Sequence, residues 1–271
     1  MKYYYLIATL PDLSLEIETA NINFDEIVET IERNLTNEDK QIFKYLIYPH
    51  DNRNLLNAIF KKHHGIVPLP FQRPAVFSPV IIEDYVQERY NFPDYMADFL
   101  MTFQERFSEM EMVETETHLV ESFIREVSQV PEAFIKDYYF FEKHLKSMVA
   151  AFNRSLYNFH GSVSVLEETE ISEKLANEGS GMSVLSQTYP FIVSLREAIH
   201  SKKPWLIEQT VDQIKWEFID HYNKEFFSNR HVYGYVLKLF ILQRRDLLEQ
   251  ADTKTHFERL NKQVGAFREL I

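Results

Sequence analysis

The sequence contains no cysteine and little glycine, with six glycines in 271 residues. The absence of cysteine excludes disulfides, thiolate metal ligands and thiol nucleophiles, and it fits a reducing compartment. Scarce glycine disfavours the tight turns of β-sandwiches and the Gly-rich loops of nucleotide-binding folds. The abundance of bulky aromatic residues, 22 Phe and 15 Tyr, instead favours an all-α protein with a well-filled core.

Long hydrophobic runs are also missing. No stretch of about 18 uncharged apolar residues occurs, so we expect no helix that spans a bilayer by itself. The opening MKYYYLIATLPDL has one Lys and a short apolar run that is broken by Pro11 and Asp12, which is not the pattern of a signal peptide. Any contact with a membrane is therefore expected to come through another protein.

The chain is acidic, with 41 Asp and Glu against 29 Lys and Arg and a formal net charge of −12. Nucleic-acid binding depends mainly on clustered Lys and Arg that contact phosphates, so this balance disfavours it. We expect no nucleic-acid partner.

Apolar residues recur at the spacing of an amphipathic helix from Asn23 onward. Asn23 suits the first N-cap, Pro49 is expected to end the second helix, and Asp51 or Asn52 is expected to cap the third. Gly65 is the stop signal of that third helix. The predicted helices span residues 23–35, 37–48 and 52–64.

Four of the ten prolines lie between Gly65 and Val80, and each restricts the residue before it to extended conformations. This segment is the predicted linker. Helical spacing returns after Pro93, predicting one or two long helices before Pro131 and another after it. The predicted organisation is a first helical unit at residues 1–67, a Pro-rich linker at 68–92, a second helical unit at 93–183 and a third at 184–271.

The C-terminal third is predicted to be helical as well, with one interruption before it. The only Gly/Ser-rich stretch, NEGSGMS at residues 177–183, predicts an exposed loop. Helical spacing is found over residues 185–199, 207–219, 233–248 and 257–267.

Candidate metal and phosphate sites fail on spacing. His63 and His64 are adjacent, so on a helix their side chains point about 100° apart and cannot share one ion. Ser180 lies between two glycines, but the Gly-Lys-Ser/Thr of a phosphate loop is missing. Two Glu–His pairs have the i, i+4 spacing, yet no second matched cluster accompanies them, and a solvated helix face explains them better. These pairs are Glu114–His118 and Glu217–His221.

Basic residues that cluster on predicted helices are the remaining candidates. Lys61 and Lys62 could bind a partner, although the dipole of the helix they end also explains them. Lys238, Arg244 and Arg245 could bind an acidic partner or pair within the chain. We predict no catalytic residue, no cofactor and no metal site, which favours an interaction role over an enzyme. The candidate partner-binding residues are Arg53, Lys61, Lys62, Lys238, Arg244 and Arg245.

Three stretches of the chain are loosely related, and each follows an aromatic-rich segment. The first is HDNRNLLNAIFKK, residues 50–62. The second is FFEKHLKSMVAAFNRS, residues 140–155. The third is YVLKLFILQRRDLLEQ, residues 235–250. We interpret them as three copies of one helical unit.

This triplication resembles the C subunit of V/A-type rotary ATPases, called d in eukaryotic enzymes. In that family a helical domain recurs three times around a central opening, and each has a helix with an acidic residue, an Asn-Leu pair and basic residues. The first stretch matches this pattern well, the second has Ser147 in place of the Asn, and the third keeps only its Tyr start and its Arg pair. The matching residues are Asp51, Asn54, Leu55, Lys61 and Lys62, then Glu142 and Met148, then Tyr235, Arg244 and Arg245.

The N-terminus resembles the Tyr-x-Tyr-Leu-x-Ala opening of the same family, while Thr9, Leu10 and Pro11 replace the arginines that follow there. It also resembles an uncharacterised bacterial family whose genes lie beside V-type ATPase genes. The matching residues are Tyr3, Tyr5, Leu6 and Ala8.

The resemblance implies three related helical bundles around a central opening and a non-catalytic coupling role. The protein would be cytoplasmic and peripheral on the inner face of the plasma membrane, with the central stalk subunits and the proteolipid ring as partners. A helical adaptor or regulator unrelated to rotary ATPases is the alternative. A helical enzyme with a carboxylate and His site is a third interpretation, which predicts a deep pocket where these groups converge.

Overall fold

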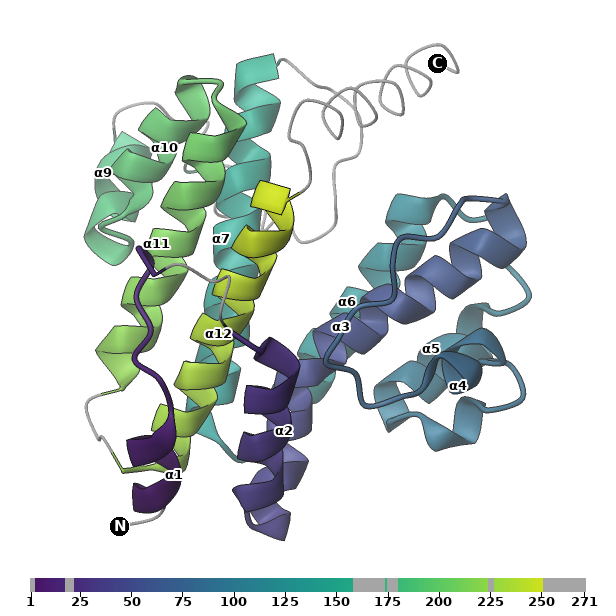
Figure 1. Ribbon diagram of the computed structural model, residues 1–271. Helices are drawn as coiled ribbons and strands as arrows, with labels where there is room; N and C mark the ends of the chain where they lie inside the picture. The colour runs from purple at the N-terminus through teal and green to yellow at the C-terminus, as the bar shows by residue number, and fades with distance from the viewer. Residues whose placement is uncertain (1–2, 18–21, 158–173, 175–179, 224–226, 251–271) are drawn as a thin grey trace. The chain divides into compact units, whose positions relative to one another are not determined.

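The computed structural model describes residues 3–17, 22–157, 174, 180–223 and 227–250, and the elements over these residues are all helices (Figure 1). The predicted all-α class is confirmed. The chain forms two compact units, one from residues 1–34 and 225–271 and the other from residues 35–224. These bounds cut across the three predicted helical units, and the arrangement of three bundles around a central opening stays a prediction.

The smaller unit is built from both ends of the chain. It contains α1 (Tyr4–Thr9), α2 (Phe24–Asn34) and α12 (Asn229–Gln250), and α2 packs on α12. Asn23 is the N-cap expected for α2, since its Oδ1 accepts the N–H of Glu26 at 3.2 Å and its Nδ2 donates to the Glu26 carboxylate at 3.0 Å. The Tyr235 hydroxyl of α12 donates to the carbonyl of Pro11 at 2.9 Å, which holds the N-terminal segment on the long helix.

The larger unit begins with α3 (Asn37–His64), one continuous helix of 28 residues that Thr36 caps. The predicted end at Pro49, with a new cap at Asp51 or Asn52, is wrong. Proline lacks the N–H that would bond the carbonyl of Tyr45 four residues earlier. The hydroxyl of Tyr139 donates to that carbonyl instead, at 2.7 Å, so the helix continues past the proline.

Gly65 ends α3 as predicted. It adopts the left-handed conformation with φ of 65°, and the N–H groups of Gly65 and Ile66 both donate to the carbonyl of Phe60. The stop signal is therefore a local one that the sequence specifies by itself.

The predicted linker at residues 68–92 contains α4 (Pro79–Glu83) and a short 3₁₀ helix, η2 (Arg89–Asn91). α4 packs on α3, and large side chains of the segment are buried. The segment from Phe77 onward thus contributes to the core of the larger unit. The buried side chains are Phe77, Ile82, Tyr85 and Phe92.

The long helices expected around Pro131 are α5 (Asp94–Phe103), α6 (Met112–Val127) and α7 (Ala133–Tyr157). α6 packs on α3, α5 and α7. Tyr45 on α3 donates its hydroxyl to Glu126 on α6 at 2.8 Å, so a partly buried polar contact joins these two helices.

The remaining helices, α9 (Ser180–Thr188), α10 (Ile192–His200) and α11 (Pro204–Tyr222), pack on α7 and on one another. Their common apolar core is formed by Phe141, Leu145, Met148, Phe152, Leu185, Ile192, Leu195, Ile199 and Ile214.

The exposed loop predicted at residues 177–183 is wrong for residues 180–183, which are helical, and the others lie outside the described residues. Gly181 is needed there, because a Cβ at this position would overlap the main chain of Lys174. The predicted helix over 185–199 is two helices, α9 and α10. The helix predicted over 257–267 lies outside the described residues.

Candidate functional site

The stretch HDNRN at residues 50–54 lies in the middle of α3 and holds the Pro-rich segment against the helix. The carboxylate of Asp51 is fully buried, and its two oxygens accept the N–H groups of Val76 and Phe77 at 3.0 and 3.2 Å. Asn54 accepts the N–H of Gln72 at 2.7 Å and donates to its carbonyl at 3.0 Å. One helical face therefore satisfies the main chain of a segment that forms no regular structure of its own.

Two further side chains of the stretch complete this polar anchor, as we call His50, Asp51, Asn52 and Asn54. His50 Nδ1 lies 2.9 Å from the carbonyl oxygen of Pro74. A carbonyl only accepts, so Nδ1 carries the hydrogen. Asn52 accepts the hydroxyl of Tyr95 on α5 at 3.0 Å. The polar anchor thus ties α3 both to the Pro-rich segment and to α5.

Burial raises the pKa of Asp51 to about 7, and the two main-chain N–H groups oppose this rise only in part. A carboxyl group with such a pKa can exchange protons at neutral pH. Asp51, however, is closed off from solvent and both its oxygens are engaged by the main chain. The arrangement is suited to holding a segment in place.

A second internal carboxylate lies in α7. Glu142 is 18 % exposed, and its oxygens lie 2.6 Å from Nζ of Lys215 on α11 and 3.6 Å from Nζ of Lys146. Burial alone would raise the pKa of Glu142, but the two lysines hold it well below its usual range. Glu142 is therefore an ionised group that fastens α7 to α11.

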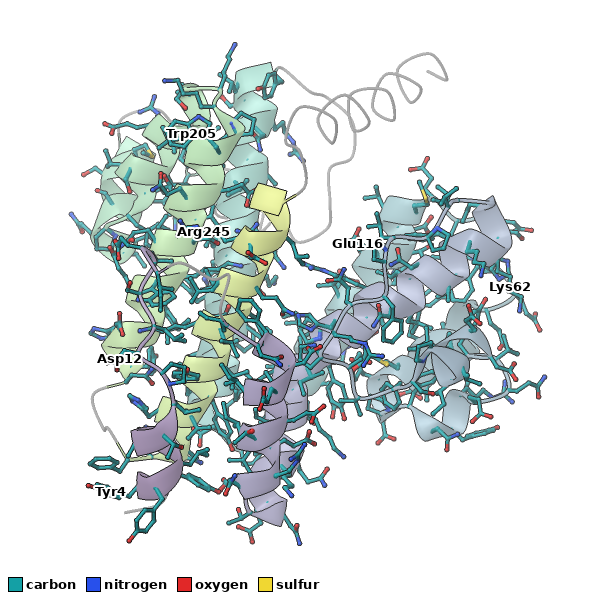
Figure 2. The ribbon with its side chains drawn as sticks, viewed as in Figure 1. Tyr4, Asp12, Lys62, Glu116, Trp205 and Arg245 are labelled. Atoms are coloured by element: carbon teal, nitrogen blue, oxygen red, sulfur yellow. The ribbon has the colours of Figure 1, made fainter. Side chains whose placement is uncertain are left out.

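The basic candidates on α3 lie at the protein surface. Arg53, Lys61 and Lys62 are exposed (Figure 2 labels Lys62). Lys61 Nζ is 3.5 Å from an exposed carboxylate oxygen of Glu83, and Lys62 Nζ lies 5.1 Å from the ring centre of Tyr85. An exposed ion pair of this kind adds little stability, so both lysines can bind other groups.

The basic candidates on α12 belong to the smaller unit. Lys238, Arg244 and Arg245 are partly buried, and Arg245 donates to the carbonyl of Leu15. This contact lies within the chain and involves a main-chain oxygen. The six candidates are thus divided between two compact units rather than collected on one helix bundle.

The histidines do not form metal sites in the part of the chain that the structure describes, where no group of three His, Asp or Glu is placed to hold an ion. His63 Nε2 lies 2.9 Å from the hydroxyl of Tyr85, and burial lowers the pKa of His63. His118 stacks on Phe103 at 4.5 Å and lies 3.9 Å from Glu114.

Sequence reasoning missed the polar anchor as a unit. It singled out Asp51 and Asn54, but as a helix cap and as a repeat motif. The sequence did contain a signal for it. Polar residues are dense at positions 50–54, directly after Pro49, where an apolar helical pattern is interrupted. The Pro-rich segment that follows α3 has main-chain groups that need hydrogen-bond partners. The Glu142–Lys215 pair had no comparable signal, because 73 residues separate its members.

Comparison with known families finds a match over nearly the whole chain. The sequence model of a family described as "Protein of unknown function (DUF2764)" matches residues 1–266. The chain belongs to the DUF2764 family. Neither the curated proteins nor the solved structures include a significant match. The DUF2764 match includes residues of both compact units. Within the described ranges, no helix of this DUF2764 protein has both the length and the apolar character to cross a bilayer.

Proposed function

We propose that this DUF2764 protein is a non-catalytic coupling subunit of a V/A-type ATPase, a socket that links the central stalk to the membrane rotor ring. The observation that carries the proposal is the position of the three related stretches. Each lies within a long helix and ends within two residues of its C-terminus, and these helices, α3, α7 and α12, have 28, 25 and 22 residues. A sequence pattern that recurs at the same end of three long helices supports a triplicated helical unit.

The first two stretches also agree in which positions face the interior. Placing Ser147 on Asn54 aligns Met148 with Leu55 and Phe152 with Ile59, and all six side chains are buried. In this register Glu142 aligns with Pro49 rather than with Asp51. The two carboxylates are therefore separate features, and the apolar and small polar positions are the part of the pattern that repeats.

A part that transmits torque must resist bending, and the larger unit has internal cross-links suited to this. α3 and α7 are joined where Tyr139 bonds the carbonyl that Pro49 leaves free, and α7 and α11 are joined by Glu142 and Lys215. Such partly buried polar contacts are directional and fix helices in one register. We propose a cytoplasmic location on the inner face of the plasma membrane, reached through the ring.

The test is capture of the rotary complex by the tagged full-length protein from membranes of its own organism. We expect the central stalk proteins and the proteolipid to be retained together. Deleting the gene should leave ATP hydrolysis but remove ATP-driven ion transport, and adding the gene back should restore transport. Capture of unrelated proteins, together with normal coupling in the deletion strain, would exclude the proposal and favour a helical adaptor or regulator.

A further inference from the structure

Residues 66–72, which we call the bow, join the end of α3 to the polar anchor. The Ile66 N–H is held by Phe60 and the Gln72 main chain by Asn54. These two attachment residues of α3, Asn54 and Phe60, are six positions apart, which is about 9 Å along the helix axis. Six residues of extended chain reach about 20 Å. Because residues before prolines are extended, the chain between the two attachments must curve away from the helix, and Figure 1 shows it returning along α3.

The bow presents apolar side chains to solvent. Val67 is 86 % exposed and Leu69 63 % exposed, and the intervening Pro68 and the following Pro70 are exposed as well. Buried polar groups of α3 fix the attachment at Gln72, so the exposed apolar residues are held in place instead of collapsing on the core. Apolar residues displayed in this way mark an interaction site.

The chain on both sides of the bow is basic, although the protein as a whole is acidic. Residues 52–82 contain no Asp or Glu, although the chain has 41 of them. Lys61, Lys62 and Arg73 flank the bow and are exposed, and Glu83 is the carboxylate that reaches Lys61. The charge around the bow is therefore complementary to an acidic partner.

We propose that the bow docks into an apolar groove, lined with aromatic side chains and rimmed with carboxylates, on the rotor partner of this chain. The inference rests on the proposed function and names the contact surface that it needs. Extended Pro-containing segments of about six residues are the ligands of such grooves, and they lose little entropy on binding because they are already extended. Lys61, Lys62 and Arg73 would face the carboxylates.

A protein groove fits better than a lipid surface. Only Ile66, Val67 and Leu69 could enter a bilayer, and one of the three flanking charges is opposed by Glu83. Each basic residue adds about 1 kcal/mol of attraction to an anionic membrane. The net charge of −12 works against that attraction.

The test compares capture of stalk and ring proteins by the tagged full-length protein and its variants. The Val67→Ser/Leu69→Ser double variant should fold normally, because both side chains are exposed, and should retain about tenfold less of the partner. Lys61→Glu/Lys62→Glu should weaken capture and reduce its salt dependence.

Val193→Ser, a matched change at a half-exposed site on α10, should capture as much as the wild type. A photo-crosslinking amino acid in place of Leu69 should attach to an aromatic-rich segment of one captured protein.

Each other result has a definite meaning. If the wild type captures the complex and the double variant captures it equally, the bow is not the contact and the proposed function stands. If the wild type captures nothing, the proposed function fails and the inference fails with it. If the wild type sediments with vesicles of phosphatidylcholine and phosphatidylglycerol, the double variant does not, and no protein is crosslinked, the bow binds lipid and the groove is excluded.

Discussion

The middle of α3 and the middle of α7 each hold a carboxylate inside the larger unit, but with opposite partners. Asp51 faces two neutral main-chain N–H groups, and its pKa rises to about 7. Glu142 faces Lys146 and Lys215, and its pKa falls well below the usual range. Burial disfavours the charge in both cases, so the charge of the partner decides the direction. The first carboxylate fixes an irregular segment and the second fixes a helix.

The largest effect should come from Asp51→Ala. The change leaves the N–H groups of Val76 and Phe77 buried without an acceptor, which costs about 4 kcal/mol at roughly 2 kcal/mol for each donor. Urea denaturation followed by circular dichroism measures the loss, and faster hydrogen exchange at the two amides locates it. Gln41→Ala, a change at an exposed position of the same helix, should alter stability by less than about 0.5 kcal/mol. Equal losses for the two variants would remove the anchoring role.

The pH dependence of the two sites should differ in sign. The folded protein binds a proton at Asp51 between about pH 7 and pH 4, where the unfolded chain, with an ordinary pKa of 3.8, does not. The contribution of Asp51 therefore grows as pH falls from 7 to 4 and is lost as pH rises through 7. The free energy of unfolding of wild type minus Asp51→Asn should increase by about 3 kcal/mol between pH 7.5 and 4.5. A flat difference would contradict the raised pKa.

Glu142→Gln should show the opposite behaviour. Its folded pKa is depressed, so its contribution is present above the ordinary value of 4.5 and is lost as pH falls toward the folded value. At pH 7 we expect a loss of about 2 kcal/mol, because Lys215 stays inside the fold without its carboxylate. Lys146→Ala is the control, since this lysine is 51 % exposed and its pair is worth under about 1 kcal/mol. If Glu142→Gln loses stability relative to the wild type only at alkaline pH, the proposed contrast between Asp51 and Glu142 is wrong.

The smallest effect concerns the proline that α3 tolerates. Tyr139→Phe removes the hydroxyl that bonds the carbonyl of Tyr45 and should cost about 1 kcal/mol. In a Pro49→Ala background, residue 49 regains the N–H that can bond this carbonyl, so the same Tyr139→Phe change should cost less. A double-mutant cycle measured by urea denaturation gives the coupling. Additive costs would show that the hydroxyl does not substitute for the missing N–H.

Local signals in the sequence were enough for some helix ends. Asn23 caps α2 and Gly65 ends α3 because their contacts lie within a few residues. The continuity of α3 could not be predicted in the same way, because it depends on Tyr139, 94 residues from Tyr45. Proline usually ends a helix, but here the hydroxyl of Tyr139 supplies the hydrogen bond that Pro49 cannot make.

The candidate site was predicted in its parts but not in its geometry. The sequence drew attention to Asp51, Asn54, Lys61 and Lys62, and all four lie on α3. Whether a polar side chain caps its own helix or holds another segment depends on what packs against it. The Pro-rich segment supplies that partner, and only the folded arrangement shows which N–H groups meet the carboxylate.

The pairing of α2 with α12 has a consequence for synthesis of the protein. The apolar side of α2, with Val28 and Ile31, leaves the ribosome roughly 200 residues before α12 is complete. At about 5 to 20 residues per second, that side waits about 10 to 40 s for its helix partner. During this interval the exposed apolar surface of α2 can bind chaperones or other unfolded chains. Moving α2 to the C-terminus in a circular permutant would shorten the wait and should reduce aggregation during expression.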